Sequence, residues 1–216
     1  MIDERVKQHL QRSLQEGLSL LNINTTTSQQ NQLCEFLILL EKWNKVHNLT
    51  SVRNIMDMVS KHLLDSLSIA RFLVGCRILD VGSGAGFPGS PLSIICPDKK
   101  FVLLDSNKKK TSFLIFVVTS LKLPNVKVVN SRVEQYQDES GFDVIISRAF
   151  ADLGKFVSCS GHLCRQQGGF LAMKGKIAQV KKELLPEGYL LTKIETVEVP
   201  GLKGERCVIF VNKKVN

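Results

Sequence analysis

The chain has 216 residues, of which 44% are hydrophobic and 23% charged, and this composition excludes disordered, collagen-like and coiled-coil proteins. Lysine and arginine outnumber aspartate and glutamate by 29 to 20, a formal charge of +9 that favours a polyanionic partner such as a nucleic acid. The longest apolar run, at 113–118, is far shorter than the roughly 20 residues of a membrane span, so we expect a cytoplasmic protein with no membrane contact.

The first 74 residues predict a small helical cap. Apolar residues recur at helical spacing in three segments, which span 6–21, 33–43 and 55–70. Each apolar stripe needs a partner to bury it. We therefore expect the three helices of 1–74 to pack together and against the rest of the chain.

From residue 75 onward, short β-rich runs alternate with helical segments, a texture typical of βαβ units in a parallel sheet covered on both faces. The last two strands flank a PGLKGE turn and should form an antiparallel hairpin. The expected fold is α/β and Rossmann-like, a seven-stranded mostly parallel sheet with an N-terminal helical cap, and 75–216 form one compact unit. Strands are expected at 77–81, 100–105, 126–131, 142–147, 168–175, 190–199 and 206–213, and helices at 88–96 and 107–121.

The six cysteines predict neither disulfides nor a metal site. The sequence has no Cys-x-x-Cys pair and no His/Cys pair at zinc spacing. We therefore expect buried free thiols and no bound metal.

A glycine-rich loop follows the first predicted strand. In RILDVGSGAGFPGSPL (77–92), four glycines separate that strand from a predicted helix. Backbone amides at a helix N-terminus, with no side chains in the way, favour an anionic group. No Gly-Lys-Ser/Thr follows, which excludes a Walker loop, and the Gly-x-Gly-x-x-Gly pattern alone is a weak indication of a dinucleotide.

Two acidic residues narrow the choice of ligand. Asp80 lies two residues before Gly82, and Asp105 ends the next strand, 23 residues after Gly82. Asp80 would repel a pyrophosphate but would bind the ammonium group of S-adenosylmethionine, whose carboxylate would meet the loop amides. Asp105 is placed to accept hydrogen bonds from ribose hydroxyls. The pattern favours this methyl donor; a nicotinamide cofactor and a loop of purely structural glycines remain as alternatives.

Eight stretches of the chain resemble the bacterial RsmG (GidB) family. They are WNKVHNLTSVRN, KHLLDS, ILDVGSGAGFPGSPLSI, LLDSNKKK, SRVEQY, ISRAFADL, MKG and PGLKGER, and they run from about residue 43 to 206. The resemblance implies a class I methyltransferase that transfers a methyl group from S-adenosyl-L-methionine to N7 of one guanosine in 16S ribosomal RNA. The sequence departs from the family at Phe87, where many members carry leucine.

The resemblance also implies where the cofactor binds. It maps the cofactor pocket onto Gly82, Phe87, Val133, Glu134 and Arg148. Because parallel strands bring their carboxyl ends to one edge of a sheet, these residues should converge there. Ordinary core packing is the alternative for the two apolar ones. With the residues taken from the loop and the next strand, the predicted cofactor site is Asp80, Gly82, Gly84, Phe87, Asp105, Val133, Glu134 and Arg148.

No motif for an acid or base catalyst stands out. SRAF follows the fourth strand, where amino-group methyltransferases carry Asn/Asp-Pro-Pro-aromatic, and neither Cys159 nor Cys164 has an activating motif beside it. Guanine N7 has an in-plane lone pair and no proton, so the reaction requires no general base. Catalysis would come mainly from alignment, with Arg148 as a candidate for positioning the substrate.

Basic residues near the predicted site are candidates for RNA contact. Arg53, His62 and Lys174 are the main candidates, and further cations are Lys61, Lys108, Lys109, Lys110 and Lys176. A satisfied buried histidine is the alternative for His62. The expected partner is 16S ribosomal RNA or the small ribosomal subunit, bound by a monomer. Two other functions remain open: a methyltransferase for a small molecule or protein, and a nucleotide-binding module without methyl transfer.

Overall fold

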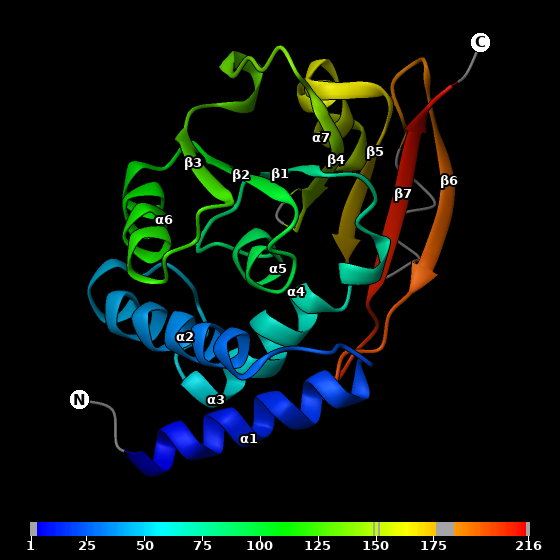
Figure 1. Cartoon of the computed structure of the whole chain (residues 1–216). Helices are drawn as coiled ribbons and strands as arrows, with labels where there is room; N and C mark the ends of the chain where they lie inside the picture. The colour runs from blue at the N-terminus through cyan, green and yellow to red at the C-terminus, as the bar shows by residue number, and fades with distance from the viewer. Residues whose placement is uncertain (1–3, 149, 151, 176–183, 215–216) are drawn as a thin grey trace.

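The computed structural model describes residues 4–148, 150, 152–175 and 184–214. Its centre is a seven-stranded sheet in the order β3-β2-β1-β4-β5-β7-β6 (Figure 1). The first five strands are parallel neighbours, and β7 runs antiparallel to both β5 and β6. The predicted sheet and its terminal hairpin are therefore confirmed. The strands are β1 Arg77–Val81, β2 Lys100–Asp105, β3 Val126–Asn130, β4 Phe142–Ser147, β5 Cys164–Lys174, β6 Tyr189–Thr196 and β7 Cys207–Lys213.

Several of the α-helices begin where the sequence supplies a side-chain cap. At the start of α2, the Thr26 side chain accepts from the Gln29 N–H, while the Gln29 side chain accepts from the Thr26 N–H. At the start of α6, Asn107 Oδ1 accepts from the two amides that follow at 109 and 110. The helices are α1 Glu4–Leu20, α2 Thr27–His47, α3 Ile55–Met58, α4 Asp65–Leu67, α5 Gly89–Ile95, α6 Lys108–Ser120 and α7 Leu153–Ser160.

The third predicted helix is continuous only from 55 to 67, and its middle differs from the prediction. Between α3 and α4, the segment Val59–Leu64 is π-helical, and a short 3-10 turn follows at Ala70–Phe72. The spacing of apolar residues predicted a uniform α-helix. It does not reveal a π-helical turn, because one extra residue in a single turn changes the spacing too little. π-helical turns are rare and occur frequently at functional sites.

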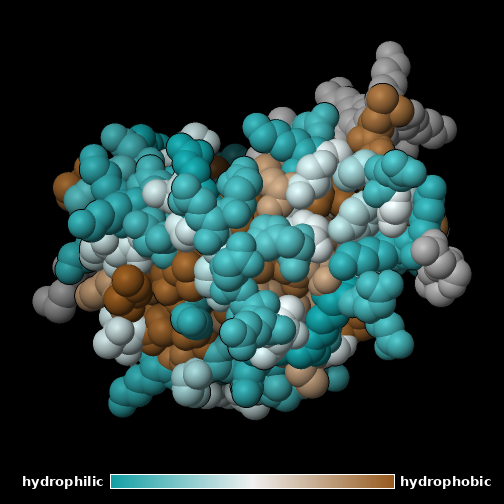
Figure 2. All heavy atoms as spheres, turned by 90° about the horizontal axis from the view of Figure 1, so that it is seen from above, coloured by the Kyte–Doolittle hydropathy of each residue, from teal (hydrophilic) through white to brown (hydrophobic). Residues whose placement is uncertain are grey.

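Both faces of the sheet are buried. One apolar cluster joins cap residues such as Leu14 and Phe36 to one face of β1 through Ile78, and the opposite face, with Leu79, packs against Phe156 of α7. The helical cap and the sheet thus share a core, and the boundary at 74/75 stays a prediction. The surface seen from above is mainly hydrophilic with a few hydrophobic areas (Figure 2).

The cysteines are free, but their burial varies. Cys34, Cys164 and Cys207 are buried as expected, Cys96 and Cys159 are half-buried, and Cys76 is exposed, contrary to the expectation. Among the described residues, no group of three or more His, Cys, Asp or Glu side chains could hold a metal ion. No helix in the described part of the chain is both long and apolar enough to cross a membrane.

Gly89, the first residue of α5, lies where the helix passes closest to the sheet. A Cβ at this position would lie 2.3 Å from Leu103 Cδ2 and 2.7 Å from Asp80 Oδ2, and both neighbours are fully buried. We expect Gly89→Ala to lower the free energy of unfolding by about 2 kcal/mol, the usual cost of overpacking a core. Urea denaturation of the purified chain measures this change. Gly175→Ala is the control, because among the described residues its Cβ would meet only Arg206 Nη1, at 3.9 Å. Equal stability of both variants would contradict the prediction.

Candidate active site

The glycine loop after β1 is tied to the end of β2. The amides of Gly82 and Ser83 donate to the Leu104 carbonyl at 2.8 and 3.1 Å, and the Gly84 amide donates to Asp105 Oδ2 at 2.8 Å. Gly82 and Gly84 have φ values of +71° and +59°, which side chains rarely adopt. The loop therefore needs glycine at both positions to pass close to the next strand.

Asp105 connects three segments at the carboxyl edge of the sheet. Its Oδ1 accepts from the Asn107 amide at 2.8 Å, and its backbone carbonyl accepts from Asn130 Nδ2 at 3.0 Å. Only 9% of the residue is exposed. The carboxylate is thus held rigidly, with its open side on the cavity described next.

A cavity of about 290 Å³ opens at this edge. Four of the predicted cofactor residues line it: Gly82, Asp105, Val133 and Glu134. Lys110 of α6 and Lys155 of α7 also lie on its wall. Val133 is 7% exposed and begins the 3-10 turn Val133–Gln135, so it presents an apolar surface to the cavity. The structure thus brings together half of the predicted cofactor site from three segments, which follow or end β1, β2 and β3.

Asp80 lies below the glycine loop and does not line this cavity. It is 0% exposed, and its Oδ2 accepts from the Gly89 amide at 2.9 Å. Its Oδ1 has no hydrogen-bond partner within the described part of the chain. Burial raises the pKa of this carboxyl to about 7, and the hydrogen bond from Gly89 only partly offsets that effect. Its contact with an ammonium group stays a prediction.

Most of the loop amides already have an acceptor within the chain, and their contact with an anionic group stays a prediction. Besides those already described, the Gly86 and Phe87 amides donate to the Ser83 carbonyl at 2.8 and 2.9 Å, and the Ser90 amide donates to Gly86 at 2.8 Å. The loop turns so tightly that its amides find acceptors within the chain. Positive charge at the cavity is supplied by the side chains of Lys110, Arg132 and Lys155 on its wall.

A second cavity, of about 450 Å³, begins beside the first. Ser147 Oγ, at the end of β4, donates to the carbonyl of Val81, which lines the first cavity, and the next residue, Arg148, lines the second. His62 and Lys174, both predicted to contact the substrate, also line the second cavity. The two cavities therefore lie at the carboxyl ends of the neighbouring strands β1 and β4.

Phe87 and Arg148, predicted for the cofactor, belong to the surroundings of the second cavity. Phe87 is 3% exposed, and the Arg148 guanidinium carbon lies 5.0 Å from the centre of its ring. The His62 ring lies 4.6 Å from the same ring. Phe87 therefore packs beneath Arg148. This position favours ordinary core packing, the alternative given above for this residue.

His62 is buried and neutral. Its Nδ1 faces the Lys61 carbonyl at 2.9 Å, and because a carbonyl only accepts, Nδ1 carries the hydrogen. Its Nε2 then accepts from Thr50 Oγ1 at 2.8 Å. Burial, with help from the charge of Arg148, lowers the pKa of His62 to about 4. The structure thus favours a satisfied buried histidine, with its edge at the cavity.

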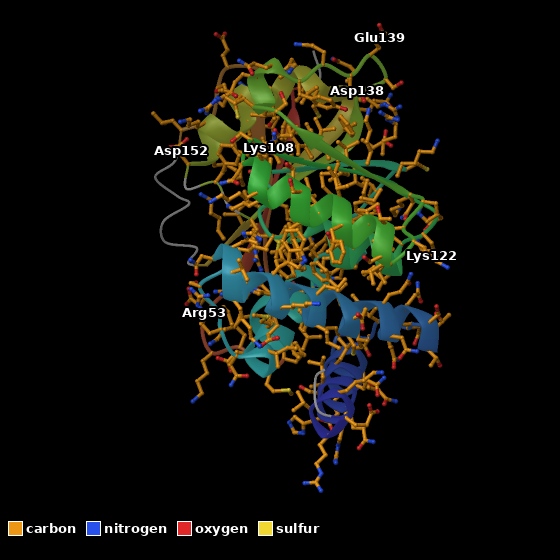
Figure 3. The ribbon with its side chains drawn as sticks, turned by 90° about the vertical axis from the view of Figure 1, so that its left-hand side faces the viewer. Arg53, Lys108, Lys122, Asp138, Glu139 and Asp152 are labelled. Atoms are coloured by element: carbon orange, nitrogen blue, oxygen red, sulfur yellow. The ribbon has the colours of Figure 1, made fainter. Side chains whose placement is uncertain are left out.

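Arg53 lines neither cavity. Its guanidinium donates to the Asn44 carbonyl at 3.1 Å and to Asn48 Oδ1 at 2.6 Å. Arg53 nevertheless lies on the same side of the molecule as Lys108 and Asp152, which follow the carboxyl ends of β2 and β4 (Figure 3). Its RNA contact stays a prediction, and Lys176 lies outside the described residues.

Sequence reasoning missed three residues of this region. Asp65, Arg206 and Lys155 were not among the predicted site residues, although the first two line the second cavity and the third lines the first. An acid within a helical pattern usually marks a solvated face, so Asp65 gave no signal by itself. Arg206 belongs to the PGLKGER stretch, which pointed to it only through the resemblance.

Comparisons with known proteins agree with this arrangement. The family described as GidB, rRNA small subunit methyltransferase G, matches residues 29–209. A ribosomal RNA small subunit methyltransferase G from Nitrosococcus oceani is 50% identical over 196 residues, which cover 91% of this chain and 92% of the relative. The protein of the same description from Vibrio cholerae is 48% identical and covers 91% and 94%.

Solved structures share the fold at low sequence identity. An S-adenosylmethionine-dependent O-methyltransferase from Thermotoga maritima is 18% identical, with a TM-score of 0.56 over 76% of this chain and 71% of its own. TrmN from Thermus thermophilus is 17% identical, with a TM-score of 0.55 over 81% and 53%. These likenesses concern the fold alone. The extent and identity of the sequence matches, together with the glycine loop and Asp105 at the cavity, establish that the chain belongs to the GidB family of rRNA small subunit methyltransferases G.

Proposed function

We propose that this chain transfers a methyl group from S-adenosyl-L-methionine to N7 of a specific guanosine in 16S ribosomal RNA. The observation that carries the proposal is the pairing of two cavities at the carboxyl ends of β1 and β4 in a chain of this family. The first cavity suits a nucleoside, and the second, which is cationic, suits a nucleotide of RNA.

The residues of the first cavity fit the cofactor. Asp105 supplies a carboxylate that can accept from ribose hydroxyls, Val133 and Leu104 supply apolar surface for a purine, and the lysines of the wall suit a carboxylate group. A Cβ added to Gly84 would have no heavy atom within 3.8 Å, so the loop leaves space beside it. When bound, S-adenosylmethionine supplies an electrophilic methyl group on a positively charged sulfur.

The chain contributes position rather than proton transfer. Guanine N7 already presents a lone pair, so no residue has to remove a proton. The glycine loop is fixed by the hydrogen bonds of Gly82 and Gly84 to the end of β2, and Arg148 is fixed by Asp65. Rigid placement of both reactants lowers the entropic part of the barrier.

The charge of the second cavity favours RNA over a small neutral molecule or a protein. Among the described residues, four cationic side chains and one carboxylate line it: Lys61, Arg148, Lys174, Arg206 and Asp65. Phosphate groups are attracted by such a surplus, and arginine also reads the guanine edge that carries N7. A base that enters must be unstacked, as bases in RNA loops are. Residues of one chain line both cavities, so a monomer suffices to bind the cofactor and the RNA. Its place of action is the cytoplasm, where ribosomal RNA lies.

The test is methyl transfer with the purified chain. We expect N7-methylguanosine, detected by mass spectrometry of nucleosides, after incubation with S-adenosylmethionine and either 16S ribosomal RNA or small subunits from cells that lack this chain. Arg148→Ala should abolish the product. Arg165→Ala is the matched control. Arg165, at the start of β5, forms an ion pair with Asp143 of β4, and neither residue lines either cavity. Absence of N7-methylguanosine in both substrates would refute the proposal.

A further inference from the structure

We propose that Asp65 is a positioning residue that holds Arg148 and Arg206 side by side, so that the two guanidinium groups bind the phosphodiester of the target nucleotide. The inference rests on the proposed function, because it concerns the cavity that would receive RNA. It assigns a role to Asp65, the one carboxylate among the described residues that line that cavity.

The carboxylate of Asp65 divides its two oxygens between two arginines. Its Oδ2 accepts from Arg148 Nη1 at 3.1 Å, and its Oδ1 accepts from Arg206 Nε at 3.1 Å. The Asp65 side chain is only 5% exposed, whereas the side chains of Arg148 and Arg206 are 23% and 33% exposed. The acid is thus buried beneath the arginines, which reach outward to the cavity.

Each arginine is restrained by a further contact on its protein side. Arg148 Nη1 also donates to the Lys61 carbonyl at 3.2 Å, and its guanidinium stacks over Phe87. Arg206 Nη1 donates to the Glu205 carbonyl at 3.0 Å. In the described part of the chain, Arg206 Nη2 has no hydrogen-bond acceptor, so donors remain for a ligand in the cavity. Two arginines that share one acid present a fork suited to phosphate oxygens.

Three distant segments must meet to build this cluster. Asp65 begins α4 directly after the π-helical turn, Arg148 follows β4, and Arg206 precedes β7, 141 residues from Asp65. The β6–β7 connection packs on the π-helical turn, where a Cβ at Gly201 would lie 3.3 Å from Ser60 Cβ. The unusual turn therefore positions the acid where the hairpin delivers its arginine.

A purely structural ion cluster is the competing explanation. A buried acid that joins the cap to the hairpin would stabilise the fold, and its loss would leave two arginines without their partner. Two observations favour the binding role. The side chains of Arg148 and Arg206 reach the cavity, 23% and 33% exposed above an acid that is 5% exposed, and Arg206 Nη2 has no acceptor among the described residues. The two explanations differ in what happens to salt-dependent RNA binding.

The experiment measures binding and turnover of the full chain. Variants Asp65→Asn and Arg206→Ala are compared with the wild type for affinity to 16S ribosomal RNA in the presence of S-adenosylhomocysteine, at several KCl concentrations. We expect about a tenfold weaker RNA affinity for each, and a slope of log affinity against log salt that is shallower by about 0.7 to 0.9, the value for one lost phosphate contact. KM for RNA should rise by a similar factor, while S-adenosylhomocysteine affinity stays within twofold.

The double variant and a control separate the two explanations. The effects of Asp65→Asn and Arg206→Ala should be less than additive, since the acid acts through the arginine. Asp138→Asn breaks a comparable pair, in which Arg77 Nη2 lies 2.9 Å from the carboxylate at the far end of β1, and should change neither affinity nor slope. In Figure 3, Asp138 lies beside Glu139 at the upper right, away from Arg53 and Asp152 at the left.

Each outcome decides one proposal. An unchanged salt slope in Arg206→Ala, or in a folded Asp65→Asn, would overturn the positioning role, even if stability falls. Arg206→Ala decides the matter should Asp65→Asn fail to fold, because Arg206 lies at the surface end of the hairpin. A wild type that binds RNA with the expected salt slope but produces no N7-methylguanosine would refute the proposed function and leave the positioning role supported.

Discussion

Asp105→Ala is expected to weaken the binding of S-adenosylhomocysteine by at least about 100-fold, equivalent to ~3 kcal/mol. The substitution removes the carboxylate proposed to accept from the ribose hydroxyls, and hydrogen bonds to charged groups contribute about 1.5–3 kcal/mol each. It also leaves the amides of Gly84 and Asn107 without the acceptors they have at 2.8 Å. The glycine loop would then lose the contact that fixes it against β2. Isothermal titration calorimetry with the purified chain measures the loss.

Two further variants show whether the loss arises at the cavity. Asp98→Ala removes an exposed acid that precedes the same strand at its opposite end, and should leave the affinity unchanged. Asp105→Asn keeps one oxygen acceptor with the same shape, so we expect an intermediate loss of about tenfold. An affinity of Asp105→Ala within threefold of the wild type, with an unchanged unfolding midpoint, would mean that the ligand does not use this carboxylate.

Much of the fold was accessible from the sequence because the strands of a parallel sheet are short apolar runs with turn residues between them. Ile78 and Leu79 of β1 are both fully buried, on opposite faces, which is why the run RILDV has no polar face. The eight-residue helix α7 was not predicted. Its signal was present: Asp152 Oδ1 accepts from the Lys155 amide, and Leu153, Phe156 and Val157 share one face.

The site was only partly accessible, and the reason is long-range packing. Gly82 and Asp105 follow a motif of fixed order along the chain, so strand topology alone places them at one edge. Phe87 lines neither cavity, because its ring packs against those of Phe36 and His62 in the core. No local pattern specifies that packing. The pairing of Asp65 with Arg206, 141 residues away, is likewise a property of the assembled fold.

Asp80→Asn is expected to change how the stability of the ligand-free chain depends on pH. The folded pKa of Asp80 is about 7, above its ordinary value of 3.8, because burial disfavours the charged form. Its stabilising contribution is therefore fully present below pH 3.8 and is lost as the pH rises through 7. Between pH 5 and pH 8 the wild type should lose about 3 kcal/mol of unfolding free energy from this group, and the variant should lose none of it. Urea denaturation across this range measures the difference between the two proteins.

The difference between Asp80→Asn and the wild type isolates this carboxyl from the other titrating groups. His62 acts with the opposite sign, because burial lowers its pKa from 6.5 to about 4 and its contribution is lost as the pH falls, but it is present in both proteins and cancels. The amide of asparagine would leave one donor buried, a cost that does not vary with pH. If the unfolding free energies of the wild type and Asp80→Asn changed with pH in the same way, the pKa of Asp80 would not be raised by burial. If Asp80 also meets the ammonium of the ligand, as the sequence predicts, affinity for S-adenosylhomocysteine should rise with pH through 7 in the wild type and not in the variant.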